Sequence, residues 1–400
     1  MNNSETTQPL SRRRVAIVTS TRADWGLLSG IARSLDSRHD VELSVIATNM
    51  HLDPRFGNTV DEILADGISV SERVEMTPAS DLPVDTVRAT ARCLEGMAGA
   101  FERQRPDLLL ILGDRYEMLA VATAATLMRI PIAHIAGGEI SEGAIDDNIR
   151  HALTKLSSLH FTATEPYRRR VIAMGEAPER VINAGAIGVY NLSSTELLTK
   201  EELVSSIGMP LDRDTLLVTM HPATADDADV AGRMQSLLDA LDRFPGSKIL
   251  FTYPNNDARG EVIIKMIHGY ANRWPGRVWV VPSLGRRRYL SVLGCVGAVV
   301  GNSSSGIVEV PSAGIPTVDI GMRQRGRIAA ESVIHAADDA DSIAKAVSMA
   351  LSAEFRKFAA GVDNPYYRPD TLRTIVETVA TYPLEALRRK NFYDIPFSLT

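Results

Sequence analysis

Residues 134–151 bring together the side chains that acid–base chemistry uses. The stretch reads HIAGGEISEGAIDDNIRH and holds four carboxylates, two histidines and one arginine. Its paired glycines let the backbone pass close to a ligand, and carboxylates can transfer protons to and from carbon. Glu139 and Asp146 are candidate catalytic residues, and Arg150 shares a helix face with Asp146 because the two lie four positions apart. The alternative is a helix cap with a salt bridge along the helix, which fits Asp147.

A further candidate carboxylate, Asp114, follows the apolar run LLLIL and Gly113. A carboxylate at the carboxyl tip of a central strand is held rigidly, and burial there can raise its pKa. We therefore expect Asp114 to be the leading catalytic carboxylate, with Arg115 beside it. The alternative is that Asp114 caps a helix that starts at Tyr116.

The stretch GNSSSGIVEVP, residues 301–311, has the composition of an anion site. Serines between a strand and a short helix leave backbone N–H groups and hydroxyls free to hold a diphosphate, which makes Ser303 and Ser304 candidates. Glu309, within the predicted helix, can accept hydrogen bonds from ribose hydroxyls, and Arg323 can neutralise phosphate charge. The alternative is an ordinary capped helix.

Two further side chains stand at the ends of apolar runs. Arg22 lies in the sequence TRADWG, in a turn that we expect to precede a helix starting near Leu27. An arginine beside a helix N-terminus can bind phosphate, and the alternative is a surface pair with Asp24. His221 ends another run before a proline, where a cationic or hydrogen-bonding imidazole can contact a diphosphate or protonate a leaving group. An isolated histidine is otherwise more often structural.

These candidates need a scaffold that presents several strand ends on one side. Aliphatic runs of strand length alternate with helical patterns, which is typical of βαβ units and a parallel sheet. The runs begin at residues 15, 41, 108, 130, 159 and 181, and, after a polar stretch at 192–213, at residues 215, 248, 277, 297 and 315. We predict an α/β protein with two Rossmann-like domains that face each other across a cleft, with the carboxyl ends of both sheets lining it.

Bulk composition narrows the class of protein. The chain has 400 residues, 45% hydrophobic and 23% charged, which suits two globular domains. A formal charge of -6 gives no basic field for nucleic acid or an anionic membrane, and no apolar window is long enough to span a bilayer. Cys93 and Cys295 lack metal-ligand spacing, so we expect a cytoplasmic protein without a disulfide or a metal site. The nucleotide motifs GxGxxG after the first strand and GxxxxGK[ST] do not occur, and we expect no cofactor.

Taken together, TRADWG, GDRYE, HIAGGE, IDDNIRHALTK, YPNND, GNSSSGIVEVP and GMRQRGR resemble motifs of the hydrolysing UDP-N-acetylglucosamine 2-epimerases of sialic-acid precursor synthesis. The resemblance implies the fold of GT-B glycosyltransferases, with a C-terminal helix that crosses back to pack on the first domain. We expect a flexible tail at 1–13, an acid–base domain at 14–190, a UDP-binding domain at 191–375 and the returning helix and tail at 376–400. A homodimer or homotetramer is also implied.

The resemblance gives roles to particular residues. The acid–base residues of the family match Asp114 and Asp146, with Arg150 and Arg115 beside them. The positions that match its UDP-binding residues are Arg22, Ala23, Arg115, His221, Asn255, Ser303, Ser304, Glu309 and Arg323.

One position departs from the family pattern. Some relatives have a glutamate directly before the glycine pair, where this chain has Ala136, so either Glu139 takes over that role or another group does. The reaction implied is conversion of UDP-N-acetylglucosamine and water to UDP and N-acetylmannosamine, by elimination of UDP and hydration of a glycal-like intermediate. A similar branch acts on UDP-N,N'-diacetylbacillosamine, and the motifs do not distinguish the two sugars. More distant alternatives are a GT-B glycosyltransferase and a non-catalytic nucleotide-sugar sensor.

Overall fold

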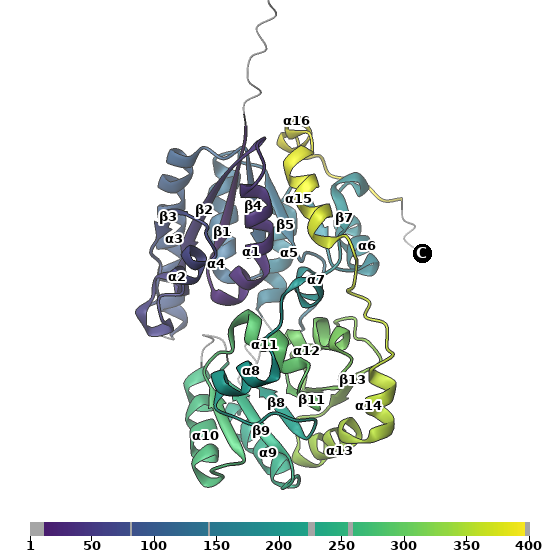
Figure 1. The fold of residues 1–400 in the computed structure, drawn as a ribbon. Coiled ribbons are helices and arrows are strands. Elements are labelled where there is room, and N and C mark those ends of the chain that lie inside the picture. The colour runs from purple at the N-terminus through teal and green to yellow at the C-terminus, as the bar shows by residue number, and fades with distance from the viewer. Residues whose placement is uncertain (1–11, 81, 143–144, 223–228, 255–258, 397–400) are drawn as a thin grey trace, which may run out of the picture.

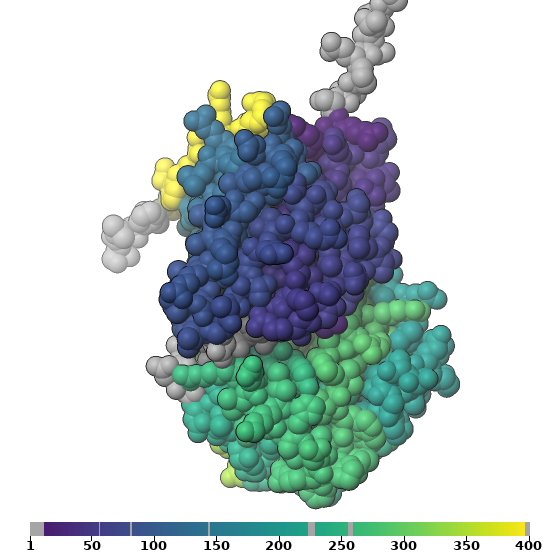
Figure 2. All heavy atoms as spheres, turned by 90° about the vertical axis from the view of Figure 1, so that its left-hand side faces the viewer, coloured from purple at the N-terminus to yellow at the C-terminus, as the bar shows by residue number. Residues whose placement is uncertain are grey.

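The computed structural model describes residues 12–80, 82–142, 145–222, 229–254 and 259–396. Two parallel sheets lie in separate halves of the molecule, stacked one above the other (Figure 1). Figure 2 shows the two halves in direct contact. The predicted α/β architecture of two Rossmann-like domains is confirmed. Within these ranges, no helix combines the length and the apolar character needed to cross a bilayer.

The described part of the N-terminal half forms a seven-stranded parallel sheet in the order β3-β2-β1-β4-β5-β6-β7. Its strands are β1 (Arg13–Thr19), β2 (Val41–Thr48), β3 (Val70–Val74), β4 (Leu108–Leu112), β5 (Ile132–Ile135), β6 (Leu159–Thr162) and β7 (Val181–Asn183). Its helices are α1 (Arg22–Asp36), α2 (Val60–Ala65), α3 (Pro83–Gln104), α4 (Tyr116–Leu127), α5 (Asp146–Leu156) and α6 (Glu165–Ala173). The first four residues of the central strand β4 are buried, as expected for a parallel strand covered by helices on both faces.

In the C-terminal half, the described residues form a six-stranded parallel sheet in the order β10-β9-β8-β11-β12-β13. Its strands are β8 (Thr215–Thr219), β9 (Lys248–Thr252), β10 (Val278–Val281), β11 (Ala298–Gly301), β12 (Thr317–Ile320) and β13 (Val333–Ala336). Its helices are α8 (Lys200–Ile207), α9 (Val230–Asp242), α10 (Gly260–Arg273), α11 (Gly285–Leu293), α12 (Ser304–Val308), α13 (Ala340–Leu351) and α14 (Ala353–Ala359).

Both halves contain short 3-10 helices. They are η1 (Asn49–Leu52), η2 (Pro54–Phe56) and η3 (Pro178–Arg180) in the N-terminal half and η4 (Val310–Ala313) in the C-terminal half.

The chain crosses between the halves twice. Helix α7 (Ile187–Ser194) leads out of the N-terminal half, and α15 (Thr371–Thr381) and α16 (Leu384–Arg388) lie back against it (Figure 1). Ile375 and Val379 of α15 belong to the same buried cluster as Leu28 of α1. Arg13 of β1 donates hydrogen bonds of 2.7 and 2.8 Å to the carbonyl oxygens of Val379 and Tyr382. The core of the N-terminal half therefore includes residues from the end of the chain.

Two strands at sheet edges were not among the predicted ones. β3 reads VSERV and β13 reads VIHA, and most of their residues are exposed or half-buried. These two edge strands carry polar residues on their exposed side, so they lack the aliphatic runs that mark the central strands.

The start of α1 also differs from the prediction. The helix begins at Arg22 and not near Leu27. Thr21 is its N-cap, and Asp24 completes a capping box by accepting hydrogen bonds from the backbone N–H of Ser20 and Thr21. Asp24 therefore serves the cap, and the alternative of a surface pair between Asp24 and Arg22 is not found.

Candidate active site

Asp114 lies just past the carboxyl end of β4, after a tight turn. Gly113 forms this turn with φ of 86°, in the left-handed region that glycine favours. Nε2 of His134, on β5, lies 2.7 Å from the carbonyl oxygen of Gly113. Burial lowers the pKa of His134 to about 4, so the imidazole is neutral and can donate this hydrogen bond. The N-cap of α4 is Arg115, so Asp114 does not cap that helix.

Arg150 on α5 is the partner of Asp114. The Arg150 side chain is 1% exposed, and its Nε and Nη2 atoms both donate to Oδ2 of Asp114, the Nε bond being 2.9 Å long. Burial alone would raise the pKa of Asp114, but the charges of Arg150 and Arg327 and the hydrogen bond from Arg150 outweigh it and lower this pKa. The raised pKa that the strand-end position suggested is not found, and Asp114 is an ionised carboxylate.

The two carboxylates at the start of α5 have different surroundings. Asp147 accepts a hydrogen bond of 2.9 Å from Nη1 of Arg150 and one of 2.6 Å from the backbone N–H of Ser141. Arg150 also donates to Oγ of Ser141 at 2.9 Å. Asp146 is the first residue of α5 and is half-buried. Asp147 thus bridges the loop before α5 and Arg150 through hydrogen bonds, and Asp146 lies at the N-terminus of α5.

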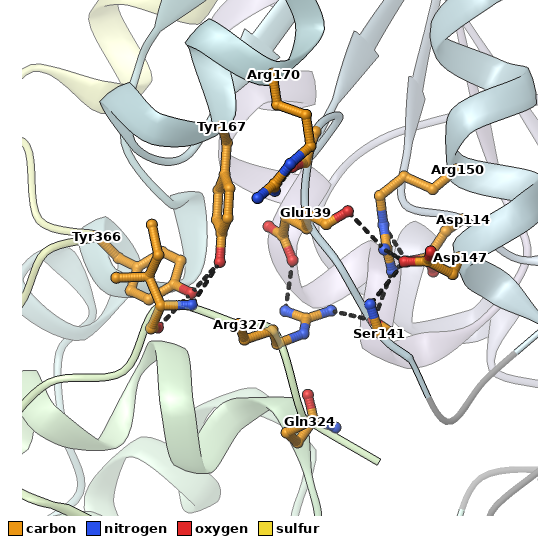
Figure 3. Close-up of polar contacts among 12 residues, drawn as sticks. Asp114, Glu139, Ser141, Asp147, Arg150, Tyr167, Arg170, Gln324, Arg327 and Tyr366 are labelled. Atoms are coloured by element: carbon orange, nitrogen blue, oxygen red, sulfur yellow. Dashed lines mark hydrogen bonds and ion pairs between the residues drawn. The ribbon is translucent and has the colours of Figure 1, made fainter. Parts of the chain in front are cut away.

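Glu139 is held by a residue of the other half. Its side chain is 8% exposed, and its Oε2 lies 2.5 Å from Nη1 of Arg327, which follows β12. Nη2 of Arg327 also donates to Oγ of Ser141 at 3.3 Å. Figure 3 shows Glu139, Arg327 and Ser141 pointing toward one another beside Asp114. Glu139 lies three residues after Ala136 and is the carboxylate nearest to it in the sequence.

Sequence reasoning missed Arg327 and Ser141 as site residues. Arg327 is the last of three arginines in GMRQRGR, of which only Arg323 was assigned a role. Three arginines within five positions of that motif were the sequence feature that could have indicated a further site residue. Ser141 lies between Glu139 and Asp147 in the acid-rich stretch and carries no signal of its own.

His221 follows β8 and is paired with Asn302 after β11. The backbone N–H of His221 donates to Oδ1 of Asn302 at 2.7 Å, and Nδ2 of Asn302 donates to the His221 carbonyl at 2.9 Å. His221, Asn302 and Arg323 line a small, partly open pocket. Burial, with the charges of Arg323 and Arg115, lowers the pKa of His221 well below its ordinary value. The imidazole is therefore neutral, which favours the hydrogen-bonding role over the cationic one.

The predicted serine-rich helix start is found. Ser303 is the N-cap of α12, which begins at Ser304 without a side-chain cap. Across the described part of the chain, the hydroxyls of Ser303 and Ser304 have no protein hydrogen-bond partner, whereas Ser305 bonds to Tyr289. Glu309 is the C-cap of α12 and does not lie within the helix, and burial raises its pKa to about 7.

The other predicted UDP-binding positions are Arg22, Ala23 and Asn255. Arg22 opens α1 and pairs with Glu62 at 3.3 Å, both side chains being partly exposed. Ala23 is the next residue and is exposed. Asn255 lies outside the described residues.

An ion pair shows that strand ends of the two halves meet. Arg327, after β12, pairs with Glu139, after β5. Arg115, after β4, contributes to the low pKa of His221, after β8, and also donates to Glu117 at 2.8 Å. The pocket beside His221 is lined by residues of the C-terminal half alone. Among the residues that the structure describes, no group of three His, Cys, Asp or Glu side chains could hold a metal ion.

Comparison with known proteins identifies the family of this chain. Residues 33–380 match the family UDP-N-acetylglucosamine 2-epimerase. The GDP/UDP-N,N'-diacetylbacillosamine 2-epimerase (hydrolyzing) of Campylobacter jejuni is 34% identical over 96% of this chain and 100% of its own length. Polysialic acid biosynthesis protein P7 of Escherichia coli is 31% identical over 96% of this chain and 98% of its own.

A solved structure has the same fold. The UDP-GlcNAc 2-epimerase of Neisseria meningitidis, solved with UDP-GlcNAc bound, superposes with a TM-score of 0.77 at 17% identity, over 92% of this chain and 99% of that one. The two parallel sheets and the family match lead to one conclusion. This chain belongs to the UDP-N-acetylglucosamine 2-epimerase family.

Proposed function

We propose that this protein is a hydrolysing 2-epimerase that converts UDP-N-acetylglucosamine and water to UDP and N-acetylmannosamine. Family membership supports a UDP-sugar substrate, and the relative named as a hydrolysing enzyme supports release of UDP. The observation that carries the proposal is the pair Asp114 and Glu139. Each is held by an arginine whose side chain is at most 10% exposed, and the charge of Arg115, beside Asp114, reaches His221 of the other half.

The first step is elimination. A carboxylate takes the proton from C2 of the sugar, the C1–O bond to UDP breaks, and the electron pair stays on the UDP oxygen. Asp114 suits the base because two arginine charges keep it ionised. The positive charge of Arg323 and the N–H of the neutral His221 stabilise the negative charge that develops on the diphosphate. The product of this step is a glycal with a double bond between C1 and C2.

The second step is hydration. Water adds its hydroxyl to C1, and C2 receives a proton from an acid on the face opposite the one that lost it. The remaining proton of the water replaces the one that this acid gave up, and the base releases the first C2 proton to solvent. Inversion at C2 therefore needs a second acid on the other face of the sugar. We assign this role to Asp146 with Glu139 in support, since both lie close in the chain to Asp147 and Ser141, which are tied to Arg150.

UDP is held by groups from both halves. The Ser303 and Ser304 hydroxyls and the backbone N–H groups at the start of α12 bind the diphosphate, and Glu309 binds the ribose hydroxyls. Arg22, Ala23 and Arg115 contribute from the N-terminal half, and Asn255 completes the set that the family resemblance implies.

A second candidate substrate is UDP-N,N'-diacetylbacillosamine. The relative of that name, at 34% identity, favours it. The deciding experiment incubates the purified protein with each UDP-sugar separately, without an acceptor, a cofactor or added metal, and follows UDP release and the free sugar by NMR. Preferential release of free N-acetylmannosamine supports the first substrate, and preferential release of the free diacetylated sugar supports the second.

The same assay tests the other classes. A glycosyltransferase would release no UDP until an acceptor is added, and a sensor would bind UDP-sugar without consuming it. Either result would refute the proposed reaction.

We also infer that the enzyme works as a homodimer or homotetramer in the cytoplasm. Support comes from the family resemblance and from Cys93 and Cys295, which are both free thiols. Light scattering behind size-exclusion chromatography measures the oligomeric state, and a monomer at micromolar concentration would contradict the first part.

A further inference from the structure

The segment after β12, residues 321–328, touches both sides of the proposed site. Arg323 and Gln324 donate hydrogen bonds of 3.1 and 2.9 Å to the carbonyl oxygen of Asn302, on the UDP side. Four residues after Arg323, Arg327 pairs with Glu139 of the other half. A single short segment thus links the residues proposed to bind UDP with those proposed to move protons.

The backbone around Arg327 is seated on the N-terminal half. A Cβ on Gly326 would lie 2.5 Å from Cγ2 of Ile140, so the two loops are in close contact. On the other flank, the backbone N–H of Ile328 donates to the Tyr167 hydroxyl at 2.9 Å. Because both neighbours are fixed, the Arg327 guanidinium has a defined position.

Through Ser141, the Arg327 guanidinium is connected to a second arginine. Oγ of Ser141 accepts hydrogen bonds from Arg327 at 3.3 Å and from Arg150 at 2.9 Å, and Arg150 holds Asp114 (Figure 3). The Arg327 side chain is 10% exposed. Burial would lower the pKa of Arg327, but the charges of Glu139 and Asp114 outweigh it and raise this pKa. The side chain is therefore a permanent cation between the two carboxylates.

We propose that Arg327 is a positioning residue for the proton transfers: carried by the UDP-binding half, it orients Glu139 and places a positive charge beside Asp114 when the halves are closed. The inference rests on the proposed function. A guanidinium cannot exchange protons at neutral pH, so Arg327 acts through the carboxylates. The acid–base groups of one half then reach their working arrangement only against the other half.

The test compares Arg327→Met and Arg327→Lys with a matched control, Arg325→Met. Arg325 pairs with Glu142 across the same boundary at 3.4 Å, but these side chains are 61% and 52% exposed. We expect Arg327→Met to lower kcat about 100-fold while KM and the UDP dissociation constant stay within about threefold. Arg327→Lys recovers part of kcat because it keeps a charge. Arg325→Met stays within about twofold of the wild type, as an exposed ion pair contributes little.

The pH profile of kcat separates positioning from a purely structural role. Arg327 is one of the charges that lower the pKa of Asp114, so its loss moves the acidic limb of the profile to higher pH, and lysine moves it back. If Arg327 only joined the two halves, its loss would not change the pH at which the acidic limb lies. The inference is overturned if kcat of Arg327→Met is unchanged. It is also overturned if kcat falls but the acidic limb of its pH profile stays where it is in the wild type.

Two checks keep the outcomes distinct. Circular dichroism reports folding, and Arg327→Gln replaces Arg327→Met under the same criteria if the latter does not fold. The wild-type protein is assayed alongside. A wild type that releases no UDP from either UDP-sugar refutes the proposed function, whereas an active wild type with a fully active Arg327→Met refutes the positioning role alone.

Discussion

Nε and Nη2 of Arg150 both donate to one oxygen of Asp114, Oδ2. Among the described residues, the other oxygen, Oδ1, accepts no hydrogen bond, and the side chain is 22% exposed. The bonds to Oδ2 thus orient the Asp114 side chain, and Oδ1 remains accessible to a ligand. This division is consistent with the proposed role of Asp114 as a general base.

Asp114→Asn should lower kcat by about 1,000-fold while leaving the UDP dissociation constant within about threefold. The amide keeps the shape of the side chain but cannot take a proton. Steady-state kinetics and calorimetric titration with UDP measure the two effects. Asp107→Asn, at the other end of β4, is the matched control and should keep kcat within about twofold. A collapse of UDP binding in Asp114→Asn would show that the role of Asp114 is wrong.

The double variant Ser303→Ala with Ser304→Ala should have the opposite pattern. Each lost hydrogen bond to UDP costs about 1 kcal/mol, so UDP affinity should fall by roughly 10-fold to 100-fold. The exposed serine pair Ser205 and Ser206 on α8 provides the control double variant. Calorimetry gives both dissociation constants, and equal affinity for the two double variants would exclude the serines from UDP binding.

UDP affinity should rise as pH increases through about 7. Burial raises the pKa of Glu309 to about 7, so the free enzyme carries a neutral acid below this pH and a carboxylate above it. Ribose hydroxyls donate more strongly to a carboxylate than to the acid, so binding favours the ionised form and releases a proton below this pH. Titrations from roughly pH 6 to pH 8 in two buffers measure affinity and proton release.

The Glu309→Gln variant isolates this effect from the titration of UDP itself. Its affinity should be weaker at high pH and should lose the part of the pH dependence that Glu309 causes. Identical pH slopes in the wild type and Glu309→Gln would refute the ribose contact.

Glu176→Gln should destabilise the N-terminal half by about 3 kcal/mol near neutral pH. Burial would raise the pKa of Glu176, but hydrogen bonds from His160, Lys155 and Lys390 outweigh it and lower the pKa to about 2. The two lysine nitrogens lie 2.6 and 2.8 Å from the carboxylate. Loss of its charge leaves these cations without their partner.

The pH dependence of this effect follows from the lowered pKa. The stabilisation is fully present above the unfolded value of 4.5 and is lost as pH falls toward about 2. Denaturant titrations of the wild type and Glu176→Gln should therefore converge in acid. Glu385→Gln, which breaks the exposed pair with Arg388, is the control and should cost under about 0.5 kcal/mol. A constant difference between wild type and Glu176→Gln at all pH values would contradict the assignment.

Much of the fold could be predicted because central strands of parallel sheets are aliphatic. β4 and β11 are such strands, and their sequence runs are visible without a structure. β3 and β13 were missed because these two edge strands keep polar residues. The start of α1 was placed late because Thr21 and Asp24 form a capping box, whose signal is two polar residues and not an apolar period.

Individual site residues could be predicted from their motifs, but the contacts between them could not. Asp114 and Arg150 each lie in a motif, yet their contact depends on how α5 packs beside β4. The pair of Glu139 and Arg327 joins the two halves, and no periodicity in sequence reports which loops meet there. The sign of the Asp114 pKa shift follows from these contacts, so it was beyond sequence reasoning as well.

The position of α15 within the core of the N-terminal half has a consequence for synthesis of the protein. Ile375, Val376, Val379, Ala380 and Leu387 complete a cluster whose other buried members, from Val15 to Ile187, were translated long before them. On the ribosome, a nascent chain that stops short of α15 leaves apolar surface of α1 in contact with water. Such surface promotes aggregation. The N-terminal half is therefore protected from aggregation only after α15 and α16 have emerged from the ribosome.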